Sequence, residues 1–325
     1  MPFPANTIYM PKVSVVIPVY NVEQYIERCL YTLFNQTLND IEYIFVDDCS
    51  PDKSVEMIYE ILENYLYRKN QVKVLHHQKN NGVAAARTTG ILAATGDYII
   101  HCDPDDYVEL TIYEKMYKYA IDKNADIVTC YYWIESPNKI NKIRNDYYQT
   151  PQESLMHLFN GCDVVLWDKL VKRSIISQYS IIPYPDIDYC EDLGCTVRIL
   201  HYAQSIYTIK EPLYHHYRRC DSITTALNKY HVDSRERCVL KLCDFLETLN
   251  KHKYNLICNR LKFYLKMEYN RVCRINDRDW FNKYRESHRS ILSFDYMPLK
   301  SRIVLWFVFQ NYYIYKILRK YISGL

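Results

Sequence analysis

The first 132 residues alternate short apolar runs with segments in which apolar residues recur at helical spacing. The apolar runs lie at residues 13–19, 41–46, 72–75, 97–102 and 126–132. The segments with helical spacing lie at residues 22–34, 54–67, 83–94 and 110–124. Continuous apolar runs are typical of strands buried on both faces, and strands that alternate with helices indicate parallel pairing through right-handed crossovers. We therefore predict an α/β fold with a mostly parallel sheet flanked by helices.

The pattern becomes less regular after the fifth apolar run. Residues 133–150 are polar, which predicts a loop, and a short helix is expected at residues 154–160. An apolar segment follows at residues 164–170, and a helix is expected to begin near Glu191. Residues 212–225 show neither a strand pattern nor helical spacing and are predicted to be irregular.

Charge divides the chain near residue 228. Residues 1–225 contain 21 Lys and Arg against 29 Asp and Glu, a net charge of −8. Residues 226–325 contain 20 against 9, a net charge of +11, and their spacing is helical with no strand pattern. We expect two parts, residues 1–227 and a basic helical tail at 228–325. The charge of the tail suits an anionic partner such as a membrane surface or nucleic acid.

Composition narrows the class of protein. Hydrophobic residues make up 49% of the chain and charged residues 24%, which fits a packed globular protein and not a disordered one. The 12 cysteines include no Cys-x-x-Cys pair, and the N-terminus lacks a basic stretch followed by an apolar one. This pattern favours reduced thiols in a cytoplasmic protein over a disulfide framework or a zinc site.

Three carboxylates directly follow the apolar run at residues 97–102. Asp103, Asp105 and Asp106 come at the expected carboxyl end of a strand, where ligands collect in open α/β sheets. Carboxylates this close repel one another, so the cluster favours a cation or a solvated turn. The Asp-x-Asp spacing suits Mg²⁺ or Mn²⁺ bound together with the diphosphate of a substrate, although a Pro-Asp-Asp stretch is also ordinary turn chemistry.

Other predicted strands also end in residues that can hold a nucleotide. These residues are Pro18, Tyr20, Asn21, Asp48, Gly82 and Arg87. The carboxylate of Asp48 can accept a hydrogen bond from the N3–H of a uracil ring. Gly82 begins a predicted helix, where free backbone N–H groups favour anions, and Arg87 lies one turn further on, within reach of a diphosphate.

Four segments together resemble the N-terminal signature of family 2 glycosyltransferases. They are residues 13–21, 47–50, 81–90 and 97–106, in this order at matching strand ends. The resemblance is close over about the first 110 residues and looser to about residue 225. It implies the GT-A fold, a Rossmann-like sheet, in a catalytic domain at residues 1–227. Within this domain, residues 1–110 would form the nucleotide-sugar half and residues 111–227 the acceptor half.

The resemblance also implies roles for the donor-site residues. Asp48 would bind the base and Arg87 the diphosphate of a UDP-sugar. Asp103 and Asp105 would hold a divalent metal, Mn²⁺ or Mg²⁺, and the donor phosphates. Of these two, Asp105 is expected to be the direct metal ligand.

The pair Glu191-Asp192 opens a predicted helix and resembles the family's pair that carries the catalytic base. Displacement at an anomeric carbon needs a carboxylate to take the proton from the acceptor hydroxyl, and this role is assigned to Asp192. Two carboxylates at a helix start are also favourable with the helix dipole alone. The chain departs from the family in the following turn, where Leu193-Gly194-Cys195 replaces a large apolar residue.

Further resemblances concern the acceptor and the metal. Trp167 and Lys169 lie in a segment similar to the family's acceptor region, and Glu191 is expected to contact the acceptor as well. A tryptophan near a strand also suits a core position. Residues 214–219, followed by Ser222, resemble a loop that folds over the donor, with His216 as a third metal ligand and an arginine that meets the phosphates.

The tail ends in apolar and aromatic runs mixed with basic residues. Residues 303–309 are apolar, and residues 312–320 alternate aromatic, aliphatic and basic side chains. Neither run reaches the ~20 apolar residues that a membrane span requires. The mixture suits a helix that lies in the membrane interface, and the alternative is a helix docked on the catalytic domain. Nucleic-acid binding is not expected, because the basic residues are diluted among apolar ones.

The sequence thus predicts an inverting, metal-dependent glycosyltransferase that uses a UDP-sugar. The resemblance and the interfacial tail together imply a lipid-linked saccharide as the acceptor, in polysaccharide biosynthesis at the inner face of the cell membrane. One alternative is a nucleotidyltransferase that makes nucleotide sugars, although the Gly-rich loop expected after the first strand is missing. The other is a non-catalytic scaffold with the same fold, which has no need of clustered acids.

Overall fold

The structure is a computed structural model that describes residues 11–136, 139–143, 145–158, 163–219, 227–273, 276–295 and 297–322. Within these residues, nine strands form one sheet in the order β3-β2-β1-β4-β8-β6-β9-β5, and β7 pairs with β6. The strands are β1 (Val13–Val19), β2 (Ile41–Asp47), β3 (Val72–His76), β4 (Tyr98–His101), β5 (Tyr107–Val108), β6 (Ile127–Ser136), β7 (Lys139–Ile143), β8 (Lys169–Lys172) and β9 (Ile206–Tyr217).

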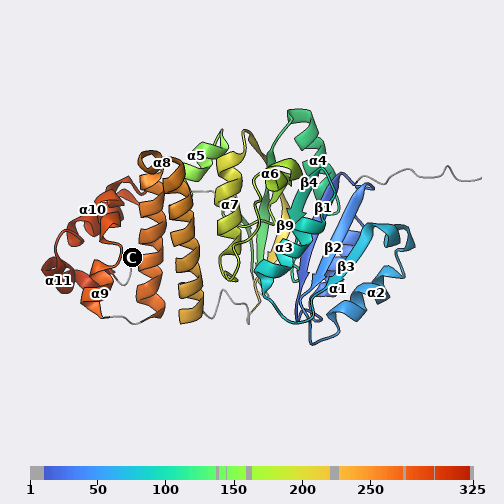
Figure 1. Cartoon of the computed structure of the whole chain (residues 1–325), viewed down its shortest axis with the longest axis horizontal. Helices are drawn as coiled ribbons and strands as arrows, with labels where there is room; N and C mark the ends of the chain where they lie inside the picture. The colour runs from blue at the N-terminus through green and yellow to red at the C-terminus, as the bar shows by residue number, and fades with distance from the viewer. Residues whose placement is uncertain are drawn as a thin grey trace, which may run out of the picture.

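The N-terminal half of the sheet is parallel, as the alternating pattern predicts. β1 pairs in parallel with β2 and β4, and β2 pairs in parallel with β3. Helices alternate with these strands along the chain and flank them in Figure 1. They are α1 (Ile26–Phe34), α2 (Ser54–Leu62), α3 (Val83–Ala93) and α4 (Ile112–Lys123). The second predicted helix is shorter than expected, since a 3₁₀ helix, η1 (Leu66–Gln71), follows α2.

Alternate residues of β1 pack into two hydrophobic cores, one on each face of the sheet. Val15 and Ile17 belong to a cluster with α1, α2 and α4, whereas Val16 belongs to a cluster with α3. Neighbouring side chains of a strand point to opposite faces, so a strand covered on both sides must be apolar throughout. This explains the continuous apolar run of β1, all of whose residues are buried.

The second half of the sheet is mixed, and two predictions for it are wrong. Residues 133–136 continue β6, which forms an antiparallel hairpin with β7, where a loop was predicted. The hairpin looks polar because β7 is an exposed edge strand. Residues 212–217 continue β9 although Pro212 cannot donate to the ladder. A register shift opposite Tyr131 accommodates the proline, in the manner of a β-bulge.

Three helices complete the part of the chain that contains the sheet, α5 (Pro151–Met156), α6 (Arg173–Gln178) and α7 (Glu191–Tyr202). α7 begins at the predicted residue. α5 begins three residues before the predicted helix, because Thr150 forms a capping box with Glu153 and a proline occupies the first helical turn. β8 forms only the end of the apolar segment at 164–170 and extends beyond it.

The C-terminal part is helical, and the described residues beyond 227 contain no strand, as predicted. α8 (Lys229–Val272) has a non-helical residue, Asn250, at which it folds back, so that its two halves stand side by side in Figure 1. The remaining elements are α9 (Asp277–Asn282), η2 (Arg285–Ser293), α10 (Leu299–Val308) and α11 (Tyr312–Ile322). No helix in the described part of the chain is long and apolar enough to cross a membrane.

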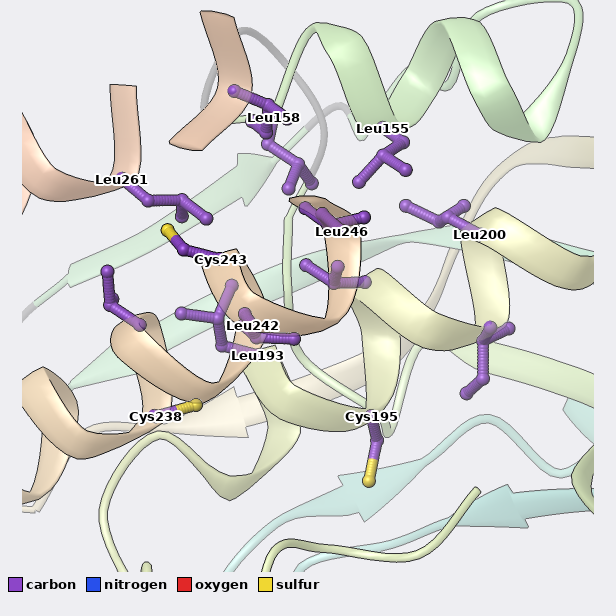
Figure 2. Close-up of a cluster of buried hydrophobic side chains, with 14 of the residues drawn as sticks. Leu155, Leu158, Leu193, Cys195, Leu200, Cys238, Leu242, Cys243, Leu246 and Leu261 are labelled. Atoms are coloured by element: carbon purple, nitrogen blue, oxygen red, sulfur yellow. The ribbon is translucent and has the colours of Figure 1, made fainter. Parts of the chain in front are cut away.

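The helical part docks on the catalytic part through a shared core. Figure 2 shows side chains of α5, α7 and α8 that meet between the helices. The labelled residues are Leu155, Leu158, Leu193, Cys195, Leu200, Cys238, Leu242, Cys243, Leu246 and Leu261. Arg260 of α8 adds polar contacts, because its buried guanidinium donates to the Met156 carbonyl and ion-pairs with Asp295. The expected boundary near residue 228 is therefore a change of charge and secondary structure within one continuous core.

Candidate active site

The predicted donor residues lie at one edge of the sheet, where the parallel strands β1, β2 and β4 end. β1 and β2 end in register, with Val19 opposite Asp47. Asn21 follows β1 and donates its backbone N–H to Ser50 Oγ, which follows β2, at 2.8 Å. Parallel strands present their carboxyl ends at the same edge, and ligands bind there in open α/β sheets.

The residues after β1 form an open surface above the buried strand. Pro18 is buried in β1, whereas Tyr20 is 46% exposed and Asn21 is exposed with a left-handed backbone, φ 53°. Asparagine is among the residues that tolerate this conformation best. The Tyr20 ring is thus available at the edge where the nucleoside was predicted to bind.

Asp48 is engaged with the turn that precedes α3. Its Oδ1 accepts from the Asn81 N–H at 2.9 Å, and its Oδ2 accepts from the Gly82 N–H at 2.8 Å. His77 Nδ1 lies 2.7 Å from the same Oδ1. The carboxylate is 3% exposed, so one of its functions is to hold the 81–82 turn against β2. The role of His77 was not predicted, and its place directly after β3 is the only sequence signal for it.

The backbone conformation and the close neighbours at position 82 require a glycine. Its φ is +87°, and a Cβ at this position would lie 2.0 Å from Asp188 Oδ1. The turn before α3 therefore touches the segment that leads into α7, which sequence reasoning did not connect. Asp188 is held in turn by Tyr230, the second residue of α8, whose hydroxyl donates to Asp188 Oδ2 at 3.1 Å.

Arg87 joins the donor edge to the start of α7. Its Nη2 donates to Asp103 Oδ1 at 2.9 Å and its Nε donates to Glu191 Oε1 at 3.1 Å. The side chain is buried, and although burial opposes it, Asp103 and Glu191 raise the pKa of the guanidinium. The buried Nη1 has no hydrogen-bond partner among the described residues. One buried N–H group of Arg87 is therefore left to donate to a ligand.

The acidic cluster contains two kinds of carboxylate. Asp106 is fully buried and accepts hydrogen bonds from the Tyr214 hydroxyl and the Tyr217 N–H, both at 2.7 Å, so it is structural. Asp105 Oδ2 lies 3.0 Å from Arg219 Nε. Burial, followed by the charges of Asp106 and Asp103, raises the pKa of Asp105 to about 7. A positive charge beside this carboxylate is favourable for that reason.

Asp103 and Asp105 fit a divalent cation, but a complete ligand set is not assembled. Mg²⁺ is usually held by one or two carboxylates together with substrate phosphates, and these two side chains supply such oxygens. No group of three or more His, Cys, Asp or Glu side chains in the described ranges is placed to hold a metal. His216 Nδ1 lies 3.3 Å from Asp106 Oδ2, and this hydrogen bond, opposed by burial, raises the pKa of His216. Ser222 lies outside the described residues.

Asp192 lies in the first turn of α7, where its Oδ1 accepts from the Leu193 N–H at 2.8 Å. Burial raises the pKa of Asp192, and the charge of Arg87 partly opposes this shift. Glu191 faces Arg87 and is buried, and burial together with Asp192 raises its pKa. A carboxylate with a raised pKa is a stronger base, which suits proton abstraction from a hydroxyl.

The two residues expected at the acceptor are internal. Trp167 is 6% exposed, stacked on Tyr214 with ring centroids 4.3 Å apart. Lys169 is buried, and its ammonium donates to the carbonyls of Asp163 and Val165 and to the Asp168 carboxylate. These contacts use all three of its hydrogens. Trp167 and Lys169 thus lie beneath the surface, and any contact with an acceptor would have to be indirect.

Comparison with known proteins agrees with this geometry. Residues 14–179 match the family described as Glycosyl transferase family 2. EpsH of Bacillus subtilis, named as a glycosyltransferase, is 34% identical over 74% of this chain and 71% of its own length. The cholesterol galactosyltransferase of Borreliella burgdorferi is 28% identical over 88% of this chain and 84% of its own length.

Solved structures show the same fold. TarS 1–349 of S. aureus in complex with UDP-GlcNAc superimposes with a TM-score of 0.67 at 18% identity, over 93% of this chain and 88% of that one. The mannosyltransferase PcManGT of Pyrobaculum calidifontis, in complex with GDP-Man and Mn²⁺, gives a TM-score of 0.54 at 14% identity, over 96% and 87%. The expected GT-A fold with a helical C-terminal region is confirmed. By its sequence match, the chain belongs to glycosyl transferase family 2 and is a glycosyltransferase.

Proposed function

We propose that this glycosyltransferase transfers a sugar from a UDP-sugar to a saccharide acceptor, with inversion and with the help of Mn²⁺ or Mg²⁺. The observation that carries the proposal is the bridge made by Arg87, which contacts Asp103 on the donor side and Glu191 beside Asp192 on the other. The bridge brings the donor acids and the expected base to one site. Family membership favours this reaction over the nucleotidyltransferase and scaffold alternatives.

On the donor side, Tyr20, Asn21 and Pro18 would line the nucleoside, while Asp48 and Gly82 form the turn beside it. Arg87 would donate its unpaired Nη1–H to a phosphate oxygen. Asp103 and Asp105 would hold the cation, which when bound stabilises the negative charge of the leaving diphosphate. UDP is favoured as the nucleotide because TarS, which shares the fold, was solved with UDP-GlcNAc.

On the acceptor side, Asp192 would take the proton of the acceptor hydroxyl as its oxygen bonds to the anomeric carbon. The bond from that carbon to the diphosphate oxygen breaks in the same step, and the configuration inverts. Glu191 would hold Arg87 and thereby the distance between base and donor. Trp167 would act by supporting Tyr214 and Lys169 by holding the segment that leads into β8, and neither by direct contact.

The donor assignment is tested by calorimetric titration of UDP with and without Mn²⁺. We expect binding that requires Mn²⁺ in the wild type and is lost in Asp105→Ala. The control is Asp122→Ala, which removes an exposed carboxylate on α4 and should bind UDP like the wild type. A parallel titration with GDP decides between nucleotides. Binding of GDP but not UDP would overturn the donor assignment, and equal binding by Asp105→Ala would overturn the metal assignment.

The tail supports an interfacial location of the acceptor. Leu299, Ile303 and Phe307 are spaced four residues apart on α10, so they form one stripe, and they are 60%, 50% and 53% exposed. Ile317 of α11 is 76% exposed. An apolar stripe on a basic segment suits the boundary of an anionic membrane. We propose that α10 and α11 bind the inner face of the cell membrane, and that the acceptor is lipid-linked in polysaccharide biosynthesis.

This location is tested by sedimentation with vesicles of phosphatidylglycerol and phosphatidylcholine. Moving two half-exposed side chains out of water is worth about 2 kcal/mol, or about a 30-fold change in partitioning. We therefore expect Ile303→Ser with Phe307→Ser to weaken vesicle binding about 30-fold. The matched control is Leu66→Ser with Ile121→Ser, two similarly exposed residues of the catalytic part. Equal binding by both double variants would contradict the membrane role.

A further inference from the structure

The helical part contains a cavity that the proposed reaction does not use. It has a volume of about 680 Å³ and lies between the second half of α8, η2 and the end of α10. In Figure 1, α8 and α10 lie on the opposite side of the molecule from β1, β2 and β3. The side chains that line it include Asn259, Arg285, His288, Arg289 and Ser290.

The polar groups that face this cavity are mostly hydrogen-bond donors. Arg285 and Arg289 both line the cavity from η2, and neither forms an ion pair or hydrogen bond with a described residue. The acid among the lining residues, Glu286, is compensated by Lys262, whose Nζ lies 3.2 Å from Glu286 Oε1. Two exposed guanidinium groups are therefore available to one ligand, and guanidinium groups bind phosphate in a bidentate manner.

A buried lysine stands behind the arginines. Lys266 is fully buried and donates to the carbonyls of Phe281 and Lys283, at 2.6 and 2.9 Å. Its Nζ also lies 2.7 Å from His288 Nε2. No carboxylate in the described residues lies within ion-pair distance of Lys266. Lys266 therefore occupies Nε2 of His288 and leaves only Nδ1 of this ring for other contacts.

His288 lies between Lys266 and the cavity. The side chain is 4% exposed, and when protonated Lys266 donates to its Nε2, the proton of the neutral ring lies on Nδ1. This Nδ1 is buried without a hydrogen-bond partner of regular geometry, although the Phe309 carbonyl is nearby. A buried donor without a regular partner beside two free guanidinium groups indicates an absent acceptor.

We propose that this cavity is a binding site for a phosphate group, held by Arg285 and Arg289 with His288 as a third donor. Asn259 and Ser290, which are hydrogen-bonded to each other at 2.9 Å, would provide contacts for hydroxyl groups attached to the phosphate. The phosphate can belong to a lipid headgroup, since α10 borders the cavity, or to a soluble phosphate ester. The proposal does not depend on glycosyl transfer.

The test is calorimetry with inorganic phosphate and with glycerol 3-phosphate, in the presence of EDTA and without a nucleotide. EDTA removes cation-dependent binding at the donor site, so failure of this test and failure of the proposed function are distinguishable. We expect saturable binding of glycerol 3-phosphate by the full chain, weakened at least tenfold in Arg285→Gln with Arg289→Gln. Both residues are exposed, and the urea midpoint of the variant verifies that it folds.

The control is Arg278→Gln with Lys251→Gln, which removes the same charge from exposed positions outside the cavity. Loss of phosphatidylglycerol vesicle binding only in the cavity variant would identify the lipid headgroup as the ligand. Loss of glycerol 3-phosphate binding with unchanged vesicle binding would identify a soluble phosphate ester. The absence of saturable binding of both phosphate probes, or equal weakening in both double variants, would overturn the proposal.

Discussion

Replacing Arg87 with methionine should destabilise the protein more strongly than any other single change at the site. The guanidinium ion-pairs with Asp103 and Glu191, and the side chains of Arg87 and Glu191 are only 6% and 10% exposed. Removing one partner of a buried ion pair leaves an uncompensated charge, which costs about 3–5 kcal/mol. We expect this loss in the free energy of unfolding at pH 8.

The loss should depend on pH, because Glu191 can be protonated. Burial and Asp192 raise its pKa in the folded protein above the ordinary value. A carboxyl group of this kind contributes stability that is fully present below its unfolded pKa and is lost as the pH rises through the folded pKa. Without Arg87 the folded pKa of Glu191 rises further, so the penalty should be about 1 kcal/mol smaller at pH 6.5 than at pH 8.

The assay is urea unfolding followed by tryptophan fluorescence at both pH values, for Arg87→Met, Glu191→Gln and the double variant. Glu191→Gln removes the stranded charge, so the double variant should be more stable than Arg87→Met at pH 8. The matched control is Arg278→Met, an exposed arginine, which should change stability by less than about 0.5 kcal/mol. Additive effects in the double variant, or a penalty that does not change with pH, would refute the reasoning.

Three further outcomes are expected. Asp192→Asn should lower kcat by about 100-fold or more with UDP affinity unchanged, as measured by UDP release and calorimetry, and full activity would exclude it as the base. Gly82→Ala should cost about 1–3 kcal/mol in urea unfolding, since φ is +87° and the new Cβ would meet Asp188, and it should weaken UDP binding; a wild-type midpoint would contradict this. Burial lowers the pKa of Lys266 to about 7, so the neutral form is favoured on folding and stability should rise by about 2 kcal/mol from pH 7 to pH 9. This rise should be absent in Lys266→Met, and the same slope in both proteins would refute the assignment.

Local patterns were sufficient to predict the parallel half of the sheet. Strands buried on both faces must be apolar throughout, and helices covered on one face must repeat near every fourth residue, so β1, β2 and β4 were recognisable from their own residues. Asp103 and Asp105 were placed at the carboxyl end of β4 for the same reason. The start of α7 at Glu191 also followed from local sequence.

Patterns whose meaning depends on a distant partner were misread. β7 is polar because it is an exposed edge, and only its pairing with β6 makes it a strand. Residues 212–217 were predicted to be irregular, but the register shift opposite Tyr131 lets β9 continue through Pro212. For Trp167 the sequence left open an acceptor contact and a core position, and only its stacking on Tyr214 shows that the side chain is buried.

The sequence by itself determined the order of the elements in the parallel half of the sheet, and with it the position of Asp48, Asp103 and Asp105 at the carboxyl ends of the strands. Tertiary structure alone decided that Arg87 joins Asp103 to Glu191, which is 104 residues away. It also decided that Gly82 must lack a side chain because Asp188 lies against it. The physical reason is that hydrophobic periodicity is a property of neighbouring residues, whereas burial of a charge is affordable only where folding supplies its partner from elsewhere in the chain.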